Sequence, residues 1–164
     1  MLSRLLFIAP IFLGACASPY PNSFTSDRDI EKAVVGSWQC TAEFGDDKRS
    51  LDVETVDSYA ADGTYKSAGP AFVSFQVEGE YIELKYWFGS FGTWKAEDGE
   101  LLLASEDLRL TILSHPGIEE VFDLNDSLPQ SMAGPASIIE LTEDNLVLSV
   151  DSNLPPVMCV RLDG

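Results

Sequence analysis

The chain has 164 residues, 45% of them apolar, and 27 acidic against 10 basic side chains give a formal charge of −17. This balance argues against binding of nucleic acid or of anionic lipid headgroups, since both depend on basic patches. The acidic residues are spread along the chain, which indicates a soluble surface or a field that attracts a cationic partner, and the length suits one domain.

The chain begins with a short apolar run, residues 5–13, that follows Arg4 and precedes two small residues. Nine apolar residues are too few to cross a bilayer, which takes about 20, and the pattern is typical of a secretory signal. The run ends in "LGAC", which closes with Cys16 and resembles the lipobox of bacterial lipoproteins.

This resemblance implies a diacylglycerol group on Cys16, cleavage just before it, and a firm lipid anchor. Residues 1–15 would then be the signal peptide, and residues 16–28, which contain two prolines, a lipidated tether. Because Ala17 rather than Asp follows the lipidated cysteine, the resemblance implies a periplasm-facing position on the outer membrane. Residues 29–164 remain as the folded domain.

A short helix is expected just before the first strand. Ser26 is a suitable N-cap with Asp29 three residues later, a variant of the capping box. Ile30 and Val34 share one helical face, and Gly36 can close the C-terminus.

From Ser37 onwards, apolar and polar residues alternate, which is the pattern of half-buried strands. Turn sequences separate the strands: "ADG" at 61–63, "EDG" at 97–99 and "TEDN" at 142–145. We therefore predict an all-β fold, a small antiparallel up-and-down barrel of about eight strands. The alternating apolar positions include Trp38, Cys40, Ala42 and Phe44, then Ile82, Leu84, Tyr86 and Phe88, then Leu108, Leu110 and Ile112, and finally Leu146, Leu148 and Val150.

Residues 114–136 interrupt this pattern and are rich in proline and glycine. We expect a long loop with one short amphipathic helix over residues 118–124. We favour a lid that closes one barrel end with Phe122 buried, and the alternative is a docking loop for a partner.

One register links the first and last predicted strands. Facing residues of an antiparallel pair have a constant sum of positions, and Trp38 with Arg161 gives the same sum as Cys40 with Cys159. With Cys16 assigned to the lipid, the other two cysteines of this exported chain are expected to form a disulfide, with local strain or a one-residue stagger. The alternative is two free buried thiols. In the same register Arg161 would lie over the Trp38 indole.

A first and a last strand can only be neighbours if the sheet closes. At this point the chain resembles the lipocalin-like, or calycin, barrels, because a short helix precedes "GSW" and an arginine comes late. The resemblance covers roughly residues 30–162 and implies a barrel floor made by Gly36, Trp38 and Arg161. It does not extend to the long 114–136 segment.

The residue types that catalysis or metal binding needs are sparse. His115 is the only histidine, so a Ser–His–Asp triad or a histidine-based metal site would depend on one loop residue. Residues 123–127 faintly resemble a calcium loop, but the twelfth position is Gly134 instead of an acid. We expect no catalytic residue, no metal and no cofactor.

The stretch "YWFGSFGTW" carries five aromatic residues in nine. We predict that Tyr86, Phe88, Phe91 and Trp94 line a pocket for an apolar ligand, and the alternative is that they fill the barrel interior. The expected function is a non-catalytic binding module for a small hydrophobic ligand or a protein. The alternative is an inhibitor or immunity-type lipoprotein whose acidic surface blocks a cationic hydrolase.

Overall fold

The strands follow one another around a closed antiparallel barrel, and each strand pairs with the next one in the sequence. The ring closes where the last strand pairs with the first. This computed structural model describes residue 24 and residues 26–46, 48–115, 117, 125, 129 and 131–162. The predicted fold class, an all-β up-and-down barrel of eight strands with one short helix, is confirmed. The signal sequence, Cys16 and the helix expected over residues 118–124 lie outside the described residues.

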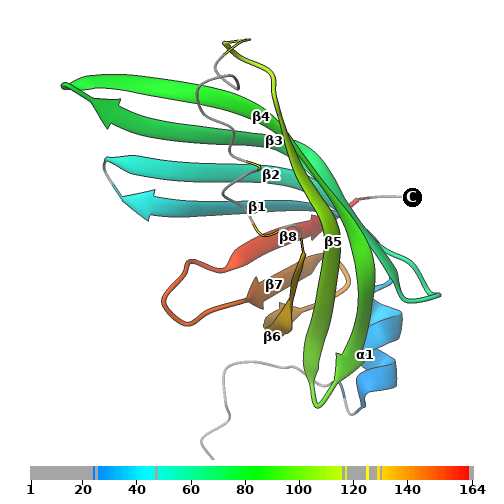
Figure 1. The fold of residues 1–164 in the computed structure, drawn as a ribbon. Coiled ribbons are helices and arrows are strands. Elements are labelled where there is room, and N and C mark those ends of the chain that lie inside the picture. Colours follow the sequence, from blue (N-terminus) through cyan, green and yellow to red (C-terminus); the bar gives the residue numbers. More distant parts are fainter. Residues whose placement is uncertain are drawn as a thin grey trace, which may run out of the picture.

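The elements occur in the order helix, then eight strands (Figure 1). Their bounds are α1 Asp27–Val34, β1 Gly36–Asp46, β2 Arg49–Tyr59, β3 Thr64–Val77, β4 Glu80–Glu97, β5 Glu100–Ile112, β6 Met132–Leu141, β7 Asn145–Ser149 and β8 Val157–Arg161. The turns expected at 61–63, 97–99 and 142–145 all lie where one strand gives way to the next, although Glu97 is still the last residue of β4 and Asn145 is already the first of β7. At the β4–β5 turn Asp98 and Gly99 have φ values of +56° and +82°, as a two-residue hairpin turn with positive φ at both positions requires.

Helix α1 closes one end of the barrel (Figure 1). The Ser26 hydroxyl caps it by accepting the backbone N–H of Asp29, and the buried residues Ile30 and Val34 share the face that packs into the core. The Asp27 carboxylate accepts backbone N–H groups from the β4–β5 turn, so the helix is fixed to that hairpin. The helix begins inside the segment expected to be tether, and Phe24 already packs against the core.

A bulge in β5 changes which residues of that strand face inwards. Two residues, Asp107 and Leu108, stand opposite Ser90 of β4, and Asp107 has a φ of +53°. Leu101 and Leu103 therefore face inwards before the bulge, whereas the inward positions after it are even-numbered.

The sequence pattern predicts one long irregular loop over residues 114–136, but the last part of this segment is a strand. Residues 132–136 belong to β6 and pair with β5, which leaves a shorter connection between the two strands. Proline and glycine are tolerated there because residues 132–136 pair with β5 on one side only, and no described strand pairs with their other side, since β7 begins to pair at Ser137.

The strands differ in length, and this divides the interior into two parts. At the α1 end, all eight strands enclose a core that contains Trp38, Tyr59, Tyr65 and Trp94. Beyond it, β6 pairs with β5 only at residues 100–105, and β8 pairs with β1 only at residues 38–41. The distal halves of β1 to β5 extend past the short strands, as Figure 1 shows. We call these distal halves the open half of the barrel.

Candidate functional site

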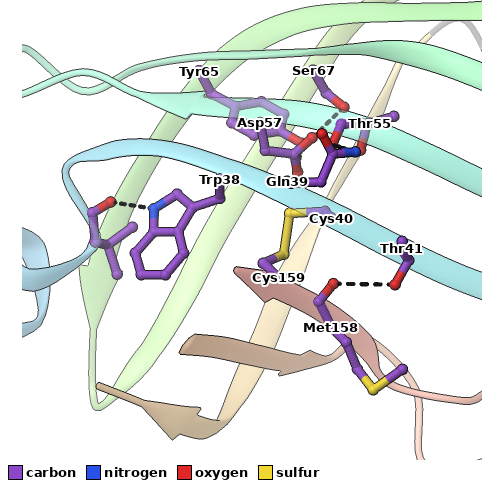
Figure 2. Close-up of a disulfide and its surroundings, with 11 residues drawn as sticks. Trp38, Gln39, Cys40, Thr41, Thr55, Asp57, Tyr65, Ser67, Met158 and Cys159 are labelled. Atoms are coloured by element: carbon purple, nitrogen blue, oxygen red, sulfur yellow. Dashed lines mark hydrogen bonds between the residues drawn. A yellow bond between two sulfur atoms is a disulfide. The ribbon is translucent and has the colours of Figure 1, made fainter. Parts of the chain in front are cut away.

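The disulfide lies in the seam where the barrel closes, between β1 and β8 (Figure 2). Cys40 and Cys159 are directly opposite each other with a Cα–Cα distance of 4.0 Å, so the predicted disulfide is confirmed and the expected stagger is absent. Their chains approach slightly more closely than the roughly 4.5 Å of an ordinary non-hydrogen-bonded pair. Both residues are buried in the larger core.

Arg161 and Trp38 form the floor beneath this disulfide. The guanidinium lies 4.0 Å from the centre of the indole ring, and the indole N–H donates to the carbonyl of Val34 at 2.8 Å. The Arg161 guanidinium also donates to the carbonyls of Ala33, Val35 and Glu143. Because Ala33 lies in the last turn of α1, the positive charge also complements the negative end of that helix.

Gly36 makes room for this arginine. A Cβ atom at Gly36 would lie 2.5 Å from the Nη1 atom of Arg161, and the residue has a φ of +141°. It follows the helix C-cap directly and turns the chain into β1. Gly36, Trp38 and Arg161 thus meet at the α1 end of the barrel.

A buried polar cluster that sequence reasoning missed lies beside the disulfide (Figure 2). The Asp57 carboxylate accepts hydrogen bonds from the Ser67 hydroxyl at 2.6 Å and from the Tyr65 hydroxyl at 3.0 Å. Burial raises the pKa of Asp57 in spite of these bonds and one from Thr55, and burial also raises the pKa of Tyr65. The nearby Tyr59 hydroxyl is buried without a hydrogen-bond partner.

This cluster is a polar layer between two apolar ones, and it places inside the barrel a carboxyl whose pKa is raised by burial. Its signal in the sequence was weak because β2 mixes polar and apolar residues on both faces. Only the pairing of Trp38 with Asp57 shows that Asp57 points inwards.

The four residues predicted to line one pocket do not lie together. Tyr86 and Phe88 belong to a small apolar cluster in the open half, whereas Trp94 belongs to the core at the α1 end. Phe91 is 48% exposed, because it is odd-numbered and the inward positions of β4 are even-numbered. The Trp94 indole N–H donates to the carbonyl of Ala60, and its ring meets Tyr59 edge-on. The aromatic residues at the α1 end are therefore packing residues.

The open half presents a continuous apolar inner face. Ala71, Leu84 and Tyr86 are buried at its centre, and half-buried side chains surround them. Among the described residues, no strand stands opposite this face, because β6 and β8 pair only with the other ends of β5 and β1. We call it the apolar inner face, and its half-buried members are Leu51, Val53, Val73, Phe75, Ile82, Phe88, Leu110 and Ile112.

One contact ties the segment after β5 to the edge of this face. The side-chain amide of Asn125 donates to the carbonyl of Leu110 and accepts its N–H, both at 2.8 Å. The Asn125 amide thus makes the two backbone hydrogen bonds with Leu110 that a neighbouring strand would otherwise make. The helix expected over residues 118–124 of the predicted lid, Phe122 included, lies outside the described residues.

Within the described part of the chain, no group of three or more metal-ligating side chains comes together. His115 is exposed with a φ of +54° just after β5, and Gly134, the twelfth position of the calcium-like sequence, is exposed in β6. The same described residues contain no helix with the length and apolarity that a membrane span requires. Neither a protein-family model nor a curated protein sequence matches this chain.

Proposed function

We propose that this protein is a lipid-anchored, lipocalin-like lipoprotein that holds a small hydrophobic molecule against the apolar inner face. The observation that carries this proposal is the row of half-buried apolar side chains with no described strand opposite. A contiguous apolar surface of this kind is typical of a ligand-binding site.

Two features support the lipocalin-like assignment. A short helix precedes eight strands in up-and-down order, and a Gly-x-Trp sequence begins β1. The late arginine crosses the tryptophan ring and ties the helix to the last strand. In the lipocalin-like family these residues close the barrel floor, which leaves the other end for the ligand.

The location follows from the "LGAC" sequence. We propose that Cys16 carries the lipid and that the protein faces the periplasm from the outer membrane. A Cys16→Ser variant should then lose its partition into a detergent phase, because the acyl chains supply the anchoring free energy. A variant that still partitions with membranes would contradict the anchor.

The ligand site is tested by a matched pair of substitutions on β2. Val53 belongs to the apolar inner face, whereas Val56 is 39% exposed on the outside of the same strand. The probe is the neutral dye N-phenyl-1-naphthylamine, whose fluorescence rises in apolar surroundings. Val53→Asp should weaken dye binding about tenfold, a change of about 1.4 kcal/mol, whereas Val56→Asp should leave it unchanged.

Thermal melts of both variants show whether each one is folded at the assay temperature. Equal dye binding by the two folded variants would contradict the proposed site. Native mass spectrometry of the delipidated protein from its host should also show a retained small molecule, and this mass should be absent from Val53→Asp.

A further inference from the structure

The distal part of β1 has an edge that no described strand covers. β8 pairs with β1 only at residues 38–41, whereas β1 continues through residues 42–46 and pairs there with β2 on its other side. Five residues is about the average length of a strand, so the edge is long enough for another strand to pair with it. Residues 42–46 contain no lysine or proline, the two residue types that most often protect an exposed strand edge.

The register identifies the backbone groups on this edge. Leu162 donates its N–H to the carbonyl of Ser37, so Ser37 points its peptide groups towards β8. Peptide groups alternate between the two sides of a strand, and the odd-numbered residues of β1 therefore all point to that side. Beyond residue 41, Glu43 and Gly45 present their N–H and C=O groups to the uncovered edge.

This edge forms one side of an open groove of about 910 Å³. Pro155 and Pro156, which lead into β8, and Met158 of β8 also line the groove. Met158 is 58% exposed, so an apolar side chain is available beside the backbone groups. The groove therefore combines an unpaired strand edge with apolar contacts, as sites that bind extended peptides do.

The groove also carries an excess of negative charge. Four acids line it against the single basic residue Arg49: Glu43, Asp46, Asp52 and Glu54. Glu43 and Asp52 stand directly opposite each other on β1 and β2, and like charges in that position destabilise a sheet. One carboxylate oxygen of Asp52 is buried without any hydrogen-bond donor. A basic side chain placed over this pair would neutralise it and supply the missing donor.

We propose that this groove binds an extended basic segment of a partner protein, which pairs as an added strand with residues 42–46 of β1. Successive side chains of a strand point to opposite faces. The partner's basic residues would therefore alternate with apolar ones, the basic side chains facing Glu43 and Asp52 and the apolar ones facing Phe44. A second copy of this chain is disfavoured, because it would bring acids against acids. The site lies on the β1 edge and adjoins the apolar inner face at Val53, which also lines the groove.

The probe is a fluorescent seven-residue peptide of alternating lysine and valine, with its ends blocked, and binding is measured by anisotropy. Control peptides carry glutamate in place of lysine, or the same composition with a central proline that blocks strand pairing. Only the unmodified basic peptide should bind.

Two variants separate charge from strand pairing. Glu43→Gln with Asp52→Asn should weaken binding about tenfold, whereas the matched double change of the exposed acids Glu83→Gln and Glu106→Gln should not. Glu43→Pro removes a backbone donor that points to the uncovered edge, and should also weaken binding about tenfold.

Hydrogen exchange of the unaltered protein gives a measurement that does not depend on any variant. At saturating peptide, the amide protons of Glu43 and Gly45 should exchange at least about tenfold more slowly. Unchanged exchange at these two amides, or binding that survives Glu43→Pro and the central proline, would overturn the strand-pairing proposal. Dimerisation without peptide that Glu43→Pro abolishes would assign the edge to a second copy instead.

Discussion

Reduction of the Cys40–Cys159 disulfide should destabilise the barrel strongly. β1 and β8 share only four residue pairs, and the disulfide joins one of them. These pairs are the contact that closes the ring, so the covalent link acts where the sheet has least other support. The two cysteines are separated by 119 residues, which makes the closed loop almost as long as the folded domain.

The magnitude follows from the length of that loop. In the chain-entropy model, a disulfide that closes a loop of about 120 residues lowers the conformational entropy of the unfolded state. This stabilises the folded state by about 5 kcal/mol. A domain of this size typically has a total stability of about 5–15 kcal/mol. With about 2–4 °C per kcal/mol, reduction should lower the melting temperature by about 10–20 °C.

The assay compares thermal melts of oxidised and reduced protein by circular dichroism. Because both sulfur atoms are buried, reduction is carried out in denaturant before refolding with reductant present. The double variant Cys40→Ala with Cys159→Ala is the control, and its melting temperature should not respond to reductant. A reduced protein that melts within about 3 °C of the oxidised one would refute the reasoning, as would two titratable thiols in the unreduced, denatured chain.

Three further predictions concern the floor and the polar cluster. Arg161→Met should cost about 2–4 kcal/mol in a denaturant melt, because it removes hydrogen bonds to three carbonyls and the contact with the indole, whereas the exposed Arg109→Met should stay within about 0.5 kcal/mol. Gly36→Ala should cost about 2 kcal/mol because of its positive φ and the nearby guanidinium, whereas Gly134→Ala, with open space around it, should be almost neutral. Burial raises the pKa of Asp57 above its usual 3.8, so the protein should lose stability relative to Asp57→Asn as the pH rises from about 4 through the raised folded-state pKa.

Each of these predictions has a clear opposing result. Equal losses for Arg161→Met and Arg109→Met would show that the floor contacts contribute little. A neutral Gly36→Ala would show that the arginine moves aside without cost. A constant stability difference between the parent protein and Asp57→Asn from about pH 4 to pH 7 would show that this carboxyl titrates normally.

The sequence alone determined the features that depend on local pattern. Alternating residues indicated the strands, short turn sequences indicated the hairpins, and Ser26 with Asp29 indicated where the helix begins. The equal position sums of Trp38 with Arg161 and of Cys40 with Cys159 also predicted that the two cysteines face each other, because facing residues of an antiparallel pair have a constant sum.

Only the tertiary structure decided which side chains share the interior and where the barrel opens. The bulge at Asp107 reverses the inward positions of β5, and the position of Phe91 on the outer face of β4 separates it from the predicted pocket. Because Asp57 is polar, the sequence pattern suggests an exposed residue. Its pairing with the buried Trp38 places it inside the barrel instead. The open half and the uncovered edge of β1 result from differences in strand length. Strand length depends on which distant segments pair with each other. This is a non-local property, so no short stretch of sequence contains it.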